Sequence, residues 1–319
     1  MALVRGPMSP PVASPRTRVI GALARLCCVI VLVACTPRSV LAHALDISLR
    51  GLGRPRQQGF DDPAVRRYRA LANDLVLAMT PKPLQPAETL GMSGFEFAVA
   101  STTTNIDETA AHWQGQPGAP VLEGALNDRQ VPSHLWTPTI HFRKGLPLST
   151  ELGVTGTYLA RSDMFMLGAE FKAALYESYF RWIPAVAARA SFSRLFGSPD
   201  LDVVAGEGDL MASLPIGIMG TLQLTPYLGG GVMFANVNSG VIDETPYIVT
   251  ESTDQKGGPR GSLYTFPTLS FFENRFTRIF AGLRVNVAML EILYELDASL
   301  VESTGDQAFS HSFKFGFDV

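Results

Sequence analysis

The chain ends on "FSHSFKFGFDV" (residues 309–319), in which four phenylalanines fall on odd positions with Ser, Lys and Gly between them. A period of two predicts a β-strand, because successive side chains point to opposite faces. In a soluble β-protein the Phe face would turn into the core. In a transmembrane barrel it would face lipid, and Ser310, Ser312 and Lys314 would face the lumen. The rest of the chain has to separate these two cases.

The same alternation recurs from about Met92 onward. In "LSTELGVTGTYLA" (148–160), Leu152 and Val154 alternate with Glu151 and Thr155. We count about ten such strands, with eight or twelve left open, and most are long enough for the 9–11 residues of a tilted membrane strand. Lengths of roughly 12–18 residues exceed the usual mode of about 5–6 in globular sheets, which argues against a soluble sandwich. The sequence therefore predicts an all-β fold, an antiparallel transmembrane β-barrel that occupies residues 91–319.

Charged residues recur on the polar face of the predicted strands, and we expect them to line the lumen. They are Glu96, Glu151, Glu170, Glu207, Asp209, Glu291, Glu295, Asp297, Arg143, Lys172, Arg181, Arg189, Arg278, Arg284 and Lys314. The apolar face is expected to contact lipid, for example through Leu152, Val154, Phe171, Val186, Leu224, Phe313 and Phe315. Because the two signs nearly balance, the lumen is predicted to be narrow or filled by paired charges. Thr155→Arg is expected to be milder than a lipid-facing change such as Leu152→Arg, because position 155 faces a polar lumen.

Connection lengths give the barrel a predicted orientation. The connections at about 101–133 and 238–272 are long, and threading ten strands puts both at the same end. Bacterial barrels carry short periplasmic turns and long external loops. We therefore expect both long loops outside, with both ends of the mature chain in the periplasm.

Residues 1–44 have the features of a secretory signal peptide. They carry five arginines, no acidic residue and an apolar run, and Ala42 and Ala44 suit cleavage between Ala44 and Leu45. Two alternatives stay open: a retained membrane anchor, and a lipobox "LVAC" (32–35) that would make a lipidated Cys35 the first residue. All three cysteines lie in this segment. Its removal changes the formal net charge from −3 to −8, which argues against a nucleic-acid partner.

Residues 45–90 are predicted to form a periplasmic segment with one helix. "DDPAVRRYRALANDLVLAM" (61–79) has apolar residues at helical spacing, Asp61 or Asp62 as the cap, and Pro63 in the first turn. "TPKPLQP" (80–86) cannot continue the helix. The helix is expected to dock on the periplasmic rim of the barrel or to enter its lumen.

Several stretches resemble a known family, among them "LQPAETLGMSGFEFAVAST" (84–102), "RKGLPLSTELGVTGTYL" (143–159) and "LTPYLGGGVMF" (224–234). They are similar to predicted outer-membrane β-barrel proteins common in myxobacteria, a largely uncharacterised family. The resemblance covers most of the chain from about Leu45. It implies an outer-membrane barrel and no established activity, so it assigns no functional residues.

Residues that could carry chemistry are few. There is no G-x-S-x-G motif and no H-x-x-x-H spacing, and His141 with a nearby carboxylate is the only catalytic hypothesis. The sequence predicts no cofactor and no metal, and it favours a barrel that is not an enzyme. We expect a structural or small-solute role, with outer-membrane lipid and the barrel-assembly machinery as partners and the ligand unknown. The alternatives are an enzyme acting on lipid or lipopolysaccharide and a surface recognition protein.

Overall fold

The computed structural model describes residues 45–116, 121–122, 131–177, 183–218, 221–244, 263–302 and 307–318. The predicted signal peptide, including Ala44, lies outside these residues, as does Arg181. None of the helices in this part of the chain has the length and apolar character needed to span a membrane.

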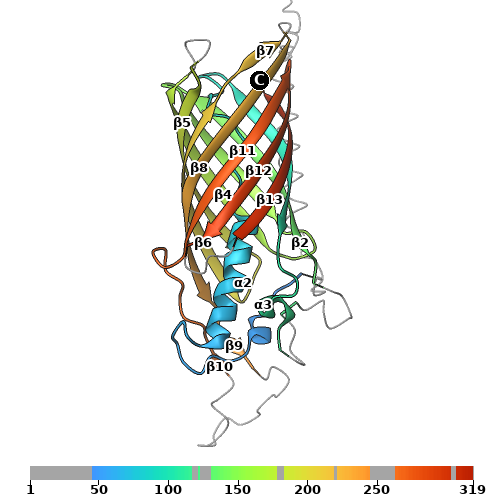
Figure 1. Ribbon diagram of the computed structural model, residues 1–319, viewed down its shortest axis with the longest axis vertical. Helices are drawn as coiled ribbons and strands as arrows, with labels where there is room; N and C mark the ends of the chain where they lie inside the picture. The colour runs from blue at the N-terminus through green and yellow to red at the C-terminus, as the bar shows by residue number, and fades with distance from the viewer. Residues whose placement is uncertain are drawn as a thin grey trace, which may run out of the picture. The chain divides into compact units, whose positions relative to one another are not determined.

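Ten long antiparallel strands form a closed barrel, which confirms the predicted fold class (Figure 1). They are β1 (Phe95–Asn105), β2 (His134–Leu146), β3 (Thr150–Tyr158), β4 (Phe165–Tyr176), β5 (Ala185–Phe196), β6 (Leu201–Ser213), β8 (Leu222–Ser239), β11 (Arg275–Val287), β12 (Leu290–Val301) and β13 (Gln307–Asp318). Each strand pairs with the next, and β13 pairs with β1. The short strand β7 (Ile216–Ile218) pairs only with β8.

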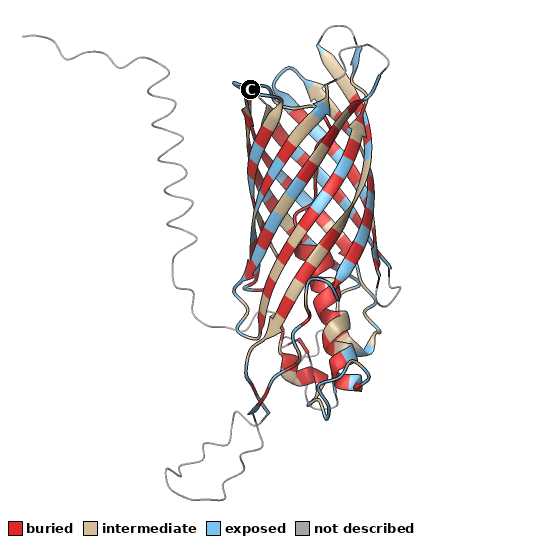
Figure 2. Ribbon diagram, turned by 90° about the vertical axis from the view of Figure 1, so that its left-hand side faces the viewer, coloured by how far each residue is buried: buried red, intermediate tan, exposed pale blue. Residues whose placement is uncertain are grey.

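The barrel is inside-out relative to a soluble protein. On β13 the Phe309, Phe313, Phe315 and Phe317 side chains are 38–52% exposed, whereas Lys314 is fully buried. The same alternation runs along the other long strands (Figure 2). Polar side chains can be buried in this way only where other polar groups satisfy them, so the contents of the lumen decide whether the arrangement is stable.

Short turns and long loops lie at opposite ends of the barrel. Residues 147–149 and 288–289 connect strands at the end where β13 terminates, which we call the short-turn end. The described parts of the two long connections lie at the other end, the long-loop end, where β9 (Ile242–Asp243) and β10 (Leu263–Tyr264) pair with each other; these parts are residues 106–116, 121–122, 131–133, 240–244 and 263–274. Which end faces outward stays a prediction.

The predicted N-terminal helix is present as α2 (Pro63–Met79). The Asp62 side chain caps it by accepting from the backbone N–H of Ala64 at 2.8 Å. The Asp62 carboxylate also accepts from the N–H groups of Arg56 and Gln57, which fixes the approach to the helix. Burial raises the pKa of Asp62, but these N–H donors together hold it below its usual value.

The position of α2 corrects our expectation of a helix docked on the periplasmic rim, opposite the long loops. The alternative, a helix that enters the lumen, holds for its last turn, where the Thr137 hydroxyl of β2 donates to the Ala78 carbonyl at 3.4 Å. The helix lies at the long-loop end (Figure 1), where η1 (Leu49–Leu52), α3 (Ala111–Gln114) and the described parts of both long loops pack around it. We call this assembly the loop-end cap, comprising residues 45–79, 106–116, 121–122, 240–244 and 263–274. The physical reason is an apolar core that the short turns at the other end could not provide.

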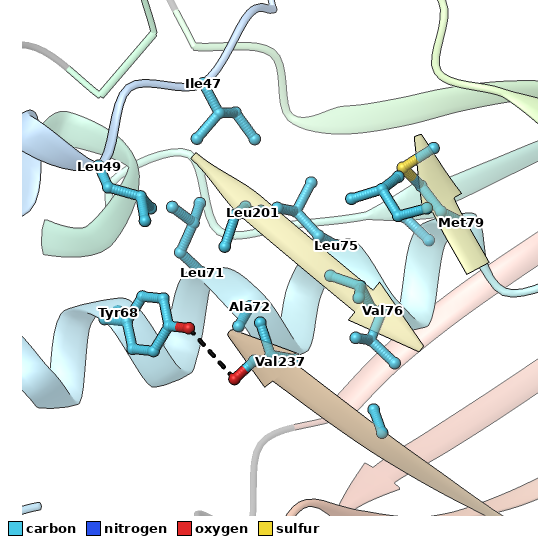
Figure 3. Packing of buried hydrophobic residues seen from close by; sticks show 14 of the residues in the cluster. Ile47, Leu49, Tyr68, Leu71, Ala72, Leu75, Val76, Met79, Leu201 and Val237 are labelled. Atoms are coloured by element: carbon cyan, nitrogen blue, oxygen red, sulfur yellow. Dashed lines mark hydrogen bonds between the residues drawn. The ribbon is translucent and has the colours of Figure 1, made fainter. Parts of the chain in front are cut away.

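That core forms around the buried face of α2 (Figure 3). Leu71 and Leu75 are almost fully buried, and the Tyr68 ring stacks on Phe266 with the ring centroids 4.6 Å apart. The Tyr68 hydroxyl donates to the Val237 carbonyl at 3.4 Å. Burial raises the pKa of this hydroxyl well above its usual range, so it remains a donor. The helix is therefore held at the long-loop end by packing along its length.

Candidate functional site: the filled lumen

The lumen contains a segment of the chain itself. Residues 80–90, which we call the thread, follow α2 and lead to β1. Residues 80–87 are all buried. At its far end the thread reaches the short turns, where the Leu90 N–H donates to the Glu151 carboxylate and the Gly145 N–H donates to the Gly94 carbonyl at 3.0 Å. The thread thus runs from the long-loop end to the short-turn end.

Proline makes this segment suitable for burial without regular secondary structure. Pro81, Pro83 and Pro86 have no N–H to satisfy, and each proline ring fixes the φ angle of its own residue. The N–H groups of Leu84 and Ala87 still need acceptors, and they donate to the Glu295 carboxylate at 3.2 Å and to Ser213 Oγ at 3.1 Å. The prediction that "TPKPLQP" ends the helix holds, but its larger role was missed.

Carbonyl groups of the thread are bound by basic side chains of the barrel wall. Arg143 donates to the carbonyl oxygen of Pro83 at 2.8 Å and to that of Leu84 at 3.3 Å. Lys172 Nζ donates to the carbonyl oxygens of Pro86 and Glu88, at 3.1 and 2.7 Å. These cations provide the hydrogen-bond donors that a neighbouring strand would provide in a sheet, and so they satisfy backbone carbonyl groups of the thread.

Two ion pairs join the thread to the wall near its ends. Lys82 Nζ lies 3.5 Å from an Asp297 carboxylate oxygen, and Glu88 lies 2.6 Å from an Arg284 nitrogen. Lys82 also donates to the Leu77 carbonyl at 2.9 Å. Neither Lys82 nor Glu88 was predicted to lie in the lumen. The only sequence signal is their placement among prolines, which is equally typical of a linker.

Charged wall residues form a nearly continuous belt around the thread. Their ion pairs run in the order Lys314–Glu96–Arg143–Glu170–Arg189, then through Glu207 and Asp209 to Arg278, and on to Asp297 and Lys82. Lys314 also pairs with Glu291 at 2.6 Å, and a separate pair joins Lys172 to Glu151 at 2.9 Å. An isolated charge in this position would be very unfavourable, so each charge of the belt depends on its ion-pair partners.

Glycines let the belt cross two strands that contribute no charge to it. Gly153 on β3 lies between Arg143 and Glu170 in register, and a Cβ there would be 2.7 Å from the Glu170 carboxylate. Gly231 on β8 lies between Asp209 and Arg278 in the same way, and a Cβ would overlap Asp209. The absence of a side chain at Gly231 therefore lets Asp209 and Arg278 approach each other over the strand.

The structure places the sequence-predicted residues as follows. Buried inside the barrel are Glu151, Glu170, Lys172, Arg189, Glu207, Asp209, Arg284, Glu291, Glu295 and Lys314, together with Glu96, Arg143, Arg278 and Asp297. On the outer face, Leu152, Val154, Phe171, Phe313 and Phe315 are exposed, and Val186 and Leu224 are half-buried. Leu45 is buried in the loop-end cap.

The catalytic hypothesis finds no complete group among the described residues. His141 is buried in the wall, with no hydrogen-bond partner recorded there for either ring nitrogen. His112 Nε2 contacts the Asp74 carboxylate at 2.8 Å, and Trp113 Nε1 donates to the same carboxylate at 2.7 Å. The Asp74 contacts hold α3 on α2. No group of three or more His, Cys, Asp or Glu side chains in the described part of the chain is arranged to hold a metal ion.

Comparisons with known proteins give only distant structural likenesses. No family model and no curated protein matches the chain. Similar solved structures include Neisserial surface protein A, at 10% identity with 70% of this chain and 96% of that one covered and a TM-score of 0.27. LpxR from Salmonella typhimurium is 12% identical over 69% of this chain and 99% of its own, with a TM-score of 0.30. The N-terminal β-barrel domain of Pseudomonas aeruginosa OprF is 12% identical over 72% and 99%, with a TM-score of 0.28.

Proposed function

We propose that the chain is an outer-membrane β-barrel whose lumen is filled by its own N-terminal segment, and that its role is structural or anchoring rather than solute conduction. The thread supports this most directly, because it occupies the lumen and is bound to the wall along its length. The exposed apolar side chains on the outer face of the barrel support residence in a bilayer. Outer-membrane lipid and the barrel-assembly machinery are the proposed partners.

Contact of the outer face with lipid can be tested by arginine substitutions at two heights along the barrel wall. Val154 lies at the middle of β3 and is 56% exposed, so Val154→Arg places a charge in hydrocarbon and should lower the free energy of unfolding by about 2–4 kcal/mol. Leu148, which is 93% exposed at a turn tip, is the matched control, and Leu148→Arg should cost about 0–1 kcal/mol. Urea titration of barrels refolded in lipid vesicles measures both. Equal losses of unfolding free energy in the two variants would contradict the proposal that Val154 lies in the hydrocarbon region of the membrane.

Thr155→Arg no longer serves as the mild control. Thr155 is buried, and a Cβ on neighbouring Gly168 would be 3.1 Å from the Pro81 ring of the thread, so the lumen has no room for an arginine here. The expectation of a mild effect considered the polarity of the lumen and not the volume that the thread occupies. We now expect Thr155→Arg to be strongly destabilising.

The first residue of the mature protein separates the two export routes. We propose cleavage between Ala44 and Leu45, and we expect the intact mass of protein purified from outer membranes to correspond to a chain that starts at Leu45. A mass that corresponds to a chain starting at an acylated Cys35 would establish the lipoprotein route instead.

A surface recognition protein is the second candidate. It is favoured by the loop-end cap, in which the described parts of both long loops pack around the N-terminal segment on an apolar core. Such an ordered surface is suited to binding a partner. Loss of binding to host or sister-cell surfaces in a strain whose cap loops are shortened, with the barrel still folded, would support it. No observation on the described residues favours the enzymatic alternative.

A further inference from the structure

The start of the described chain is fixed at the long-loop end by backbone contacts. The Leu45 N–H donates to the Arg161 carbonyl at 2.9 Å, and the Ser48 N–H donates to the Val121 carbonyl at 2.8 Å. Arg161 lies in the turn between β3 and β4 at this end of the barrel. Leu49 adds a third contact, because its N–H donates to the Asp200 carboxylate at 2.9 Å.

The first strand begins at the opposite end. Glu96, the second residue of β1, pairs with Asp318 at the end of β13, and the Gly91–Gly94 turn precedes it. Between these two fixed points the chain passes down α2 and through the lumen as the thread. The chain therefore crosses the full height of the barrel once before the wall begins.

We infer that this barrel carries its own N-terminal segment across the membrane, so that Leu45 and the loop-end cap stand on the same side as the two long loops and any segment joined before Leu45 is displayed there. The location of Leu45 follows from the path of the chain, which connects the cap to β1 through the lumen. Moving α2 to the short-turn mouth would require residues 45–79 to leave the cap and pass back through a lumen that the thread fills.

The inference also replaces the expected periplasmic location of residues 45–90. If the long loops face outward, as barrels of this kind generally arrange them, the cap and the mature N-terminus are at the cell surface. The two ends of the mature chain then lie on opposite sides of the membrane. This path of the chain is the same whether or not the barrel conducts solutes.

Single cysteines test the sidedness directly, because residues 45–319 contain no native cysteine. Gln57→Cys probes the exposed tip of the N-terminal segment. Val241→Cys, at a position that is 68% exposed, marks the long-loop end, and Leu148→Cys marks the short-turn end. Intact cells are treated with a membrane-impermeant maleimide before and after permeabilisation, and the cysteine-free parent gives the background.

We expect Gln57→Cys to label as Val241→Cys does, in intact cells, and Leu148→Cys to label only after permeabilisation. If the barrel is inserted the other way round, Gln57→Cys should still follow Val241→Cys, which also supports the inference. A Gln57→Cys variant that labels together with Leu148→Cys overturns it. Arg66→Cys, on the exposed side of α2, provides a second probe should the first variant fail to fold, as judged by heat-modifiable migration on gels.

An epitope placed directly before Leu45 tests display itself. We expect an antibody to bind this epitope on intact cells, and a matched epitope inserted after Leu148 to be reached only after permeabilisation. If the epitope before Leu45 is reached only after permeabilisation while Val241→Cys is labelled on intact cells, the barrel does not carry a preceding segment across.

Discussion

Deletion of residues 45–90 should turn a silent barrel into a conducting one. The full-length protein is expected to give no porin-like steps in a planar bilayer, because the buried thread occupies the lumen and its backbone is bonded to Arg143, Lys172 and Glu295. A chain that starts at residue 91 retains all ten strands and loses both the thread and α2. Its conductance should be small, since a ten-strand barrel is little wider than one that side chains just fill.

The deletion variant should also prefer cations weakly. The described wall buries eight acidic and six basic side chains, and the deleted thread carries one charge of each sign, Lys82 and Glu88, so its removal leaves this excess unchanged. A slight excess of negative charge in a narrow pore concentrates cations. Under a salt gradient, the reversal potential should therefore shift modestly in the cation-selective direction.

Two controls keep this prediction open to contradiction. Heat-modifiable migration on a gel shows whether the deletion variant has formed a barrel. A second variant keeps the chain length but replaces residues 81–88 with Gly and Ser, so that the segment is present without its prolines, Lys82 and Glu88. This variant should leak intermittently. Large stable steps from the full-length protein, or a folded deletion variant that stays silent, would contradict the filled-lumen proposal.

The strand faces were predictable because a period of two is a local property of the sequence. Whether a residue number in a strand is odd or even is enough to assign its side chain to one face. The structure accordingly buries Glu151 and exposes Leu152 and Val154. Ten strands followed from counting such stretches, and the closing pair between β13 and β1 followed from the need to remove sheet edges. No knowledge of distant contacts was required for these steps.

The contents of the lumen could not be predicted in the same way. "TPKPLQPAETL" (80–90) has no periodicity, and a proline-rich polar segment is more often a linker. Its buried state depends on acceptors and donors from distant strands, as for the bond between Leu84 and Glu295, which are 211 residues apart. The side of the barrel on which α2 docks also depends on distant residues, chiefly those of the two long loops.

Replacement of Arg189 should be among the most damaging single changes in the chain. Arg189 on β5 is buried and contacts three carboxylates, those of Glu170, Glu207 and Asp209. Methionine would fill a similar volume without the charge, and it would leave these carboxylates with fewer partners in a site that lacks bulk water. Breaking a buried ion pair by removing one partner costs about 3–5 kcal/mol. We expect Arg189→Met to lower the free energy of unfolding by about that amount.

Arg194 on the same strand is the matched control, because it points outward and pairs with Asp202 while remaining about half exposed. An exposed pair of this kind is worth about 0–1 kcal/mol, so Arg194→Met should be close to neutral. Urea titration of both variants in the same vesicles gives the comparison. If the two losses are equal, the belt contributes no more than surface charge does and the lumen is wetter than its ion pairs indicate. A large loss confined to Arg189→Met would show that the wall depends on continuous pairing around the thread.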